Sequence, residues 1–381
     1  MVKIFNKLQS FFERPFLLQR NQTTNIPCAH SRFNQQSNIS ELSLKSLVGK
    51  SLKLVDICFK SPNLKPVSAQ LFPTSLEEKQ AIAKNVKVGD TIFLELVGKP
   101  DEYISYGIVF MQKFSRFLKL TPSHSYNNTN TDHVSMVVGV DEEKGEILIS
   151  ECMPAKGDKV RTVSFFKSEA RVSKDAAYKY HFFRATDPTC QSITLRAAEI
   201  GSRLGFKPKS LLQANEIQAS PPVKSPFSFP KAIYSMLTNG FKFKRKDQAK
   251  VFRSIFEEAI KARVAMNGKK PRKFFCSMFC AHVYQQAEAA QAWEKMTQEK
   301  PELKNSLDQL IAQTQKAPMH KQVQLISKWS KAMAKNEGAT LAQQMKFFKF
   351  NSDKISPVGL YNFYEKNSVM TKVLTLVDPS L

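Results

Sequence analysis

The sequence predicts an α+β protein in which an antiparallel sheet packs against a helix that begins with a cysteine. Two observations indicate this class. Between residues 47 and 190, short β-branched or aromatic runs are bounded by Gly, Asp, Asn or Pro, as strands are. Beyond residue 190, apolar residues recur at helical spacing, for example in KVFRSIFEEAIKARV. With 381 residues, the chain is long enough to bury a sizeable core without disulfide bonds.

The predicted strands are short apolar runs between turn signals: SLKLVDICF, VGDTIFLELVG, YGIVF, HVSMVVGV, EILISECM and YKYHFFRA. The predicted helices are amphipathic segments that follow them: TLRAAEIGSRLGF, KVFRSIFEEAIKARV, SMFCAHVYQQAEAAQAWEKM, a helix starting at Pro301, and a segment with Val323, Ile326 and Met333 on one face. We therefore expect four parts. They are a poorly structured or amphipathic lead-in (1–45), a core (46–285) with a helical insertion at about 206–270, a second helical insertion (286–350), and a segment (351–381) that returns to the core.

The formal net charge of +24 predicts attraction to anionic surfaces, namely an acidic protein or an anionic membrane. The lead-in could lie on such a membrane, since Ile4, Leu8, Phe11 and Phe12 fall at helical spacing among basic residues. Nucleic acid is not an expected partner, because the lysines are spread along the chain and no nucleic-acid-binding signature is present.

The scattered cysteines do not resemble a secreted disulfide framework. No run of residues is apolar enough to span a bilayer, and the first twenty residues lack the unbroken apolar middle of an export signal. The sequence thus predicts a cytoplasmic protein, with no transmembrane span and no general export signal.

A histidine and a glutamate stand on the two strands of one predicted hairpin, HVSMVVGVDEEKGEILISE, whose charged turn ends at Gly145. If the hairpin folds about Glu142, His133 lies across from Glu151. A carboxylate beside an imidazole fixes its tautomer and favours its protonated form, as a general base requires. A slip of one residue would bring Cys152 opposite instead.

The stretch RKFFCSMFCAHVYQQ places two cysteines and a histidine within seven residues. Cys276 is expected at a helix N-terminus, where the macrodipole and free backbone N–H groups lower the pKa of a thiol and can receive an oxyanion. Cys280, one turn further on, is expected to be a small buried hydrophobe. Two alternatives remain: a zinc site formed by both cysteines and His282, and His124 as the base in place of His133.

Taken together, these pieces resemble the circularly permuted papain-like cysteine hydrolases, which include YiiX-like and NlpC-type enzymes and, more distantly, lecithin:retinol acyltransferases. In this group the histidine precedes the cysteine. The matching segments are VGDTIFLE (Gly89, Asp90), DHVSMVVGV (His133), ILISE (Glu151), KYHFFRA (Arg184), FFCSMFCAHVY (Cys276, Ser277) and ISPVGLYNF.

The resemblance implies a catalytic triad in which Cys276 is the nucleophile, His133 the base and Glu151 the orienting residue. It implies an enzyme that cleaves or transfers the acyl group of an amide, isopeptide, ester or thioester, in a peptide, modified protein or lipid-linked substrate, without cofactor or metal. The helical additions and the composition also resemble effectors that intracellular bacteria inject into host cells, which makes a host cell an alternative destination. The rival interpretation is a non-catalytic protein that uses the fold to hold an acidic protein or membrane.

Overall fold

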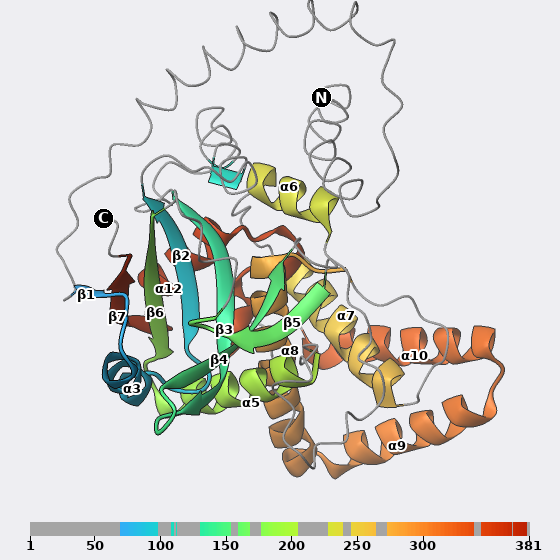
Figure 1. Ribbon diagram of the computed structural model, residues 1–381. Coiled ribbons are helices and arrows are strands. Elements are labelled where there is room, and N and C mark those ends of the chain that lie inside the picture. Colours follow the sequence, from blue (N-terminus) through green and yellow to red (C-terminus); the bar gives the residue numbers. More distant parts are fainter. Residues whose placement is uncertain are drawn as a thin grey trace, which may run out of the picture. The chain divides into compact units, whose positions relative to one another are not determined.

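The computed structural model describes residues 69–97, 108–109, 112, 130–153, 159–167, 177–204, 228–238, 245–263, 273–338, 344–367 and 369–378. All of them belong to the second of two compact units, Met1–Leu64 and Lys65–Leu381. The amphipathic lead-in, the predicted strand SLKLVDICF and the alternative base His124 lie outside the described residues. Within them, the α+β prediction is confirmed by a mixed seven-stranded sheet and eight α-helices (Figure 1).

The sheet contains β1 (Ala69–Leu71), β2 (Thr91–Val97), β3 (Thr131–Asp141), β4 (Glu146–Met153), β5 (Lys159–Ser164), β6 (Ala177–Ala185) and β7 (Met370–Val377). Their spatial order is β1-β7-β6-β2-β3-β4-β5. The prediction of an antiparallel sheet is correct for every pair except β1 and β7, which run parallel. Strand β7 comes from the far end of the chain and completes the sheet beside β6.

Other differences from the expected strands have local causes. Ile108 and Val109, expected in a strand, are helical. Residues 76–85, inside the region of strand-like texture, form a helix because Ser75 and Glu78 make a capping box. Strand β5 was not expected at all, because KVRTVS lacks a regular alternation of apolar residues.

The helices are α3 (Leu76–Asn85), α5 (Pro188–Leu204), α6 (Phe229–Thr238), α7 (Arg245–Arg263), α8 (Cys276–Glu299), α9 (Pro301–Lys316), α10 (Met319–Met333) and α12 (Pro357–Asn367). Pro301 occupies the first turn of α9, as its position predicted. The expected boundary after residue 285 falls inside α8, which continues without a break to Glu299.

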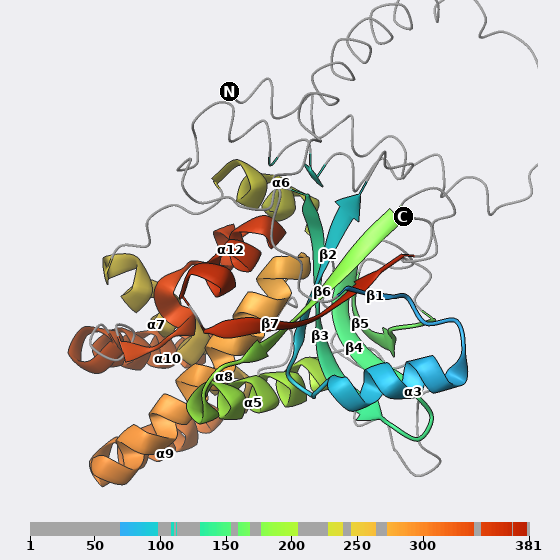
Figure 2. The same ribbon diagram turned by 90° about the vertical axis from the view of Figure 1, so that its left-hand side faces the viewer.

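Helices α5, α8 and α12 pack against strand β3, and Figure 2 shows them on one side of the sheet. The second half of α8 extends beyond the sheet and joins α7, α9 and α10 in a separate apolar cluster. Trp293 of α8 contributes to this cluster through edge contacts with Phe256 and Trp329. Helix α8 therefore belongs both to the sheet core and to the added helices.

Buried polar side chains fix the position of α8. Ser277 Oγ donates to the Ile355 carbonyl (2.7 Å), just before α12. Further along the helix, Gln285 Nε2 donates to the carbonyls of Phe347 (3.0 Å) and Phe350 (2.9 Å). Because a buried polar group without a partner is costly, these bonds tie α8 to the segment before α12 in one register.

Tyr284 attaches α8 to the sheet at the turn before β2. Its hydroxyl donates to the Gly89 carbonyl (3.2 Å) and shares a short hydrogen bond of 2.5 Å with the Thr91 hydroxyl. Next to this turn, the buried Asp90 accepts two hydrogen bonds from Arg184 of β6, at 3.0 and 2.7 Å. Two segments that carry the family resemblance thus meet in a structural ion pair.

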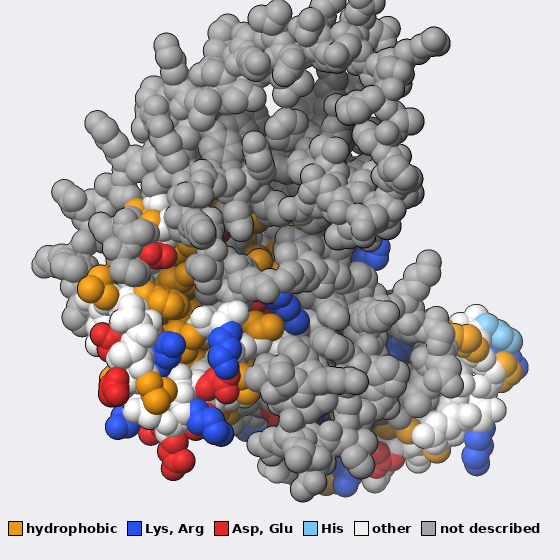
Figure 3. All heavy atoms as spheres, viewed as in Figure 1, with side chains coloured by type: hydrophobic (Ala, Val, Ile, Leu, Met, Phe, Trp, Pro, Cys, Tyr) orange, Lys and Arg blue, Asp and Glu red, His pale blue; other side chains and the backbone are white. Residues whose placement is uncertain are grey.

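Within the part of the chain that the structure describes, none of the helices is sufficiently long and apolar to cross a membrane. Figure 3 shows one face of the molecule, on which the described Lys and Arg side chains are interspersed with Asp and Glu. Among the described side chains visible in this view, the positive charges do not gather into a single basic patch.

We predict that Gly89→Ala lowers the free energy of unfolding by about 2 kcal/mol. Gly89 has φ +92°, and an added Cβ would lie 2.9 Å from the backbone of Thr194. The matched control is Gly139→Ala, since its added Cβ would meet the Leu148 side chain at 3.3 Å. Because a side chain can move more easily than the backbone, Gly139→Ala should lower the free energy of unfolding by less than about 1 kcal/mol. Urea denaturation measures both, and equal losses would contradict this description of the turn.

Candidate functional site

Cys276 is the first residue of α8, as expected. The preceding residue, Phe275, is extended and makes no side-chain cap hydrogen bond to the first turn of the helix. The side chain of Cys276 is buried, with 6% of the residue exposed. Its sulfur lies close enough to β3 to accept a hydrogen bond from the backbone N–H of Val134, the residue that follows His133.

The expectation of a lowered thiol pKa at this position is wrong. Burial raises the pKa of Cys276 to about 12, and the charge of Asp132 acts in the same direction. The N–H groups of Val134, Ser277 and Cys276 itself lower the pKa but do not offset the loss of water. In this arrangement the thiol is neutral at pH 7, so a nearby base must take its proton before it can act as a nucleophile.

His133 and Glu151 are in contact. The Nε2–H of His133 donates to Oε2 of Glu151 at 3.0 Å, and Glu151 is fully buried. His133 itself is nearly buried, with 8% exposed. Because Nε2 faces the carboxylate, this contact leaves Nδ1 on the other side of the ring, away from Oε2 of Glu151.

The register that brings them together differs from the prediction by two residues. Glu151 lies directly across from Ser135, and a bulge between Val137 and Gly139 shifts the pairing toward the turn. A shift of two residues leaves the same side chains on the same face of a strand. His133 therefore meets Glu151 diagonally, within reach of a long side chain, and Cys152 does not take the place of Glu151.

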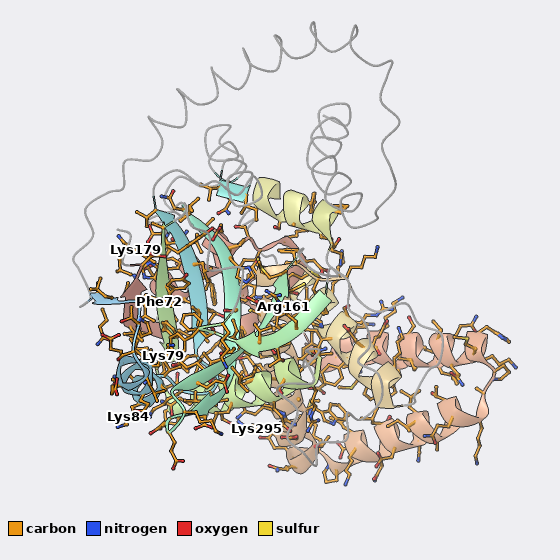
Figure 4. The ribbon with its side chains drawn as sticks, in the orientation of Figure 1. Phe72, Lys79, Lys84, Arg161, Lys179 and Lys295 are labelled. Atoms are coloured by element: carbon orange, nitrogen blue, oxygen red, sulfur yellow. The ribbon has the colours of Figure 1, made fainter. Side chains whose placement is uncertain are left out.

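Arg161 is a third member of this group that sequence reasoning missed. It stands directly opposite Glu151 on β5. Its Nε and Nη2 both donate to Oε1 of Glu151, at 3.1 and 2.9 Å. Figure 4 labels Arg161 on β5. The two oxygens of Glu151 are thus divided between one imidazole and one guanidinium group.

The other candidates from the opening stretch have different surroundings. Cys280 is fully buried, and its thiol pKa is raised well above the ordinary value by burial first, and then by Cys276 and Glu151. His282 is also fully buried, with Nε2 3.3 Å from Oε2 of Glu258 on α7. Neither residue takes the place of Cys276 at the helix start.

A third buried histidine forms a contact that the sequence did not predict. His181 of β6 bonds Oε2 of Glu95 through Nε2 (2.8 Å) and accepts from the Thr375 hydroxyl through Nδ1 (3.1 Å). Burial lowers the pKa of His181, against the charge of Glu95. Because both ring nitrogens are used, we interpret this cluster as a link between β2, β6 and β7.

Among the described residues, no group of three or more His, Cys, Asp or Glu side chains is arranged to hold a metal ion. Comparison with known proteins gives no family model, no curated protein and no solved structure that matches this chain. The site must therefore be interpreted from its own chemistry.

We predict that Glu151→Gln lowers the free energy of unfolding by about 3 kcal/mol, because it leaves Arg161 without its buried counter-charge. The matched control is Glu294→Gln on α8, which removes a two-point contact with Arg196 at 2.7 and 2.6 Å. Since that pair is solvent-exposed, its loss should cost less than about 1 kcal/mol. Thermal and urea unfolding of both variants check this, and comparable small losses would show that the Glu151 contacts contribute little.

Proposed function

We propose that this protein is a cysteine-dependent hydrolase or acyltransferase with a permuted papain-like core. It acts on an amide, isopeptide, ester or thioester bond through Cys276, His133 and Glu151. The observation that carries the proposal is the position of the Cys276 sulfur, at the start of a helix and against the strand residue that follows His133.

Two further features support these roles. The hydrogen bond from Nε2 to Glu151 holds the His133 ring in one orientation and stabilises its protonated form. The backbone N–H groups around the sulfur, which include those of Ser277 and Val134, are donors suited to a developing negative charge. Both features belong to the chain itself and require no cofactor.

The mechanism that follows has two steps. His133 takes the proton of the Cys276 thiol through Nδ1, and the thiolate attacks the substrate carbonyl to form a thioester as the leaving group departs with a proton from His133. Water or an acceptor then attacks the thioester, again with His133 as the base, and the free thiol is restored. An acceptor in place of water turns hydrolysis into transfer.

A second candidate function has its own support. A buried thiol whose pKa is about 12 is unreactive by itself, and the chain has a formal net charge of +24. Both facts suit a protein that keeps this arrangement for structure and binds an acidic protein or an anionic membrane. The two functions differ in one measurable property, which is whether His133 lowers the pH at which Cys276 reacts.

The test is the rate at which iodoacetamide alkylates Cys276 as a function of pH, followed by peptide mass spectrometry. If His133 accepts the proton, the rate in the unaltered protein rises with an inflection near neutral pH. In His133→Ala the inflection should move toward about 12, the value that burial imposes on the thiol. At pH 7 the rate should then fall by at least about 100-fold.

Cys280→Ala serves as the control, because it removes a buried thiol one turn away and should leave the profile of Cys276 in place. A profile without a neutral inflection in the unaltered protein, or one that His133→Ala does not change, would contradict the enzyme and favour the binding protein.

A further inference from the structure

Glu151 is a buried carboxylate between two cationic groups. It is fully buried, whereas the side chain of Arg161 is 16% exposed and that of His133 is 10% exposed. Oε2 accepts from His133 and Oε1 accepts twice from Arg161. An isolated buried carboxylate tends to take up a proton, because burial disfavours the charged form.

We infer that Arg161 is a positioning residue for the reaction: it keeps Glu151 ionised and aimed at His133, and so sets the pH range in which His133 can act as a base. This inference rests on the proposed function, since it assigns Arg161 a role through the same histidine. It adds a fourth residue, on the neighbouring strand β5, to Cys276, His133 and Glu151.

The physical reason is that the guanidinium group stays charged at every pH that the folded protein tolerates. While Arg161 is in place, the negative charge of Glu151 is balanced even when His133 is neutral. Without Arg161, Glu151 would lose the two hydrogen bonds and the positive charge at Oε1, and burial would then favour its protonated form more strongly. The pair formed by His133 and Glu151 would then bind a proton at a higher pH.

Other ionisable groups face the pair and must be considered with it. Asp132 lies on β3 beside His133, and its charge acts on Cys276. On α8, Cys276 and Cys280 are both buried neutral thiols, and Cys280 feels the charge of Glu151. Asp132 is the acidic neighbour and does not replace a cation, so none of these groups can take over the role of Arg161.

The experiment is an NMR titration of the His133 ring, whose Cε1–H signal is identified from its disappearance in His133→Gln. The chain contains only six histidines, so the assignment is tractable. In Arg161→Gln the midpoint of the His133 titration should rise by about 1 to 3 pH units. Arg161→Met, which fills similar space without a charge, should give the same shift and replaces Arg161→Gln if that variant does not fold.

Two controls separate charge at this site from general effects. Arg161→Lys keeps the positive charge, so its midpoint should stay closer to that of the unaltered protein than either neutral variant does. Arg196→Gln removes an arginine with a two-point contact to the exposed Glu294, and should leave the midpoint unchanged.

A folded Arg161→Gln or Arg161→Met protein with an unchanged midpoint would overturn the inference, even if its stability had fallen, because a purely structural arginine would give that result. The titration needs no turnover, so it remains decisive if Cys276 proves unreactive and the proposed function fails. If both hold, the neutral inflection of Cys276 alkylation should move up in pH together with the His133 midpoint.

Discussion

The structure depends most on where helix α8 is held. Five hydrogen bonds attach it to separate parts of the chain: those of Ser277 and Gln285 to the segment before α12, and those of Tyr284 to Gly89 and Thr91 at the start of β2. Its apolar face joins the sheet core to the cluster of added helices. Since the first turn of α8 carries Cys276, these contacts also decide where the thiol lies relative to β3.

Burial disfavours the charged forms of both Cys276 and Glu151, but only Glu151 has cationic partners that compensate for it. It raises the pKa of Cys276 to about 12 and so removes the reactivity that a helix N-terminus would otherwise give. For Glu151, the nearby imidazole and guanidinium groups compensate the burial through hydrogen bonds to both of its oxygens. Under the proposed function, a base must therefore take the proton of Cys276, and the His133 ring, which Glu151 holds through a hydrogen bond, is the group proposed for this role.

Local patterns in the sequence predict much of this, and long-range packing explains the rest. EILISECM coincides with β4 because it is a largely apolar run that begins directly after Gly145, which ends the turn. The turn pairs Asp141 with Glu146, three residues from the predicted register, and a bulge that no local signal marks reduces the difference to two residues at Glu151. The contact of Arg161 with Glu151 depends on the pairing of β5 with β4, which no local pattern predicts. The raised pKa of Cys276 depends on burial, which only the folded structure shows. The capping box of Ser75 and Glu78, by contrast, is a local signal in the sequence that marks the start of α3.

The central claim is that Cys276, His133 and Glu151 form one reacting group, and a crystal structure of the protein tests it most directly. The quantity to measure is the distance from the sulfur of Cys276 to Nδ1 of His133, with the bond from Nε2 to Glu151 intact. The account predicts about 3 to 4 Å, the range over which a proton can pass between them. A separation beyond about 6 Å, with the ring held away from the start of α8, would contradict it.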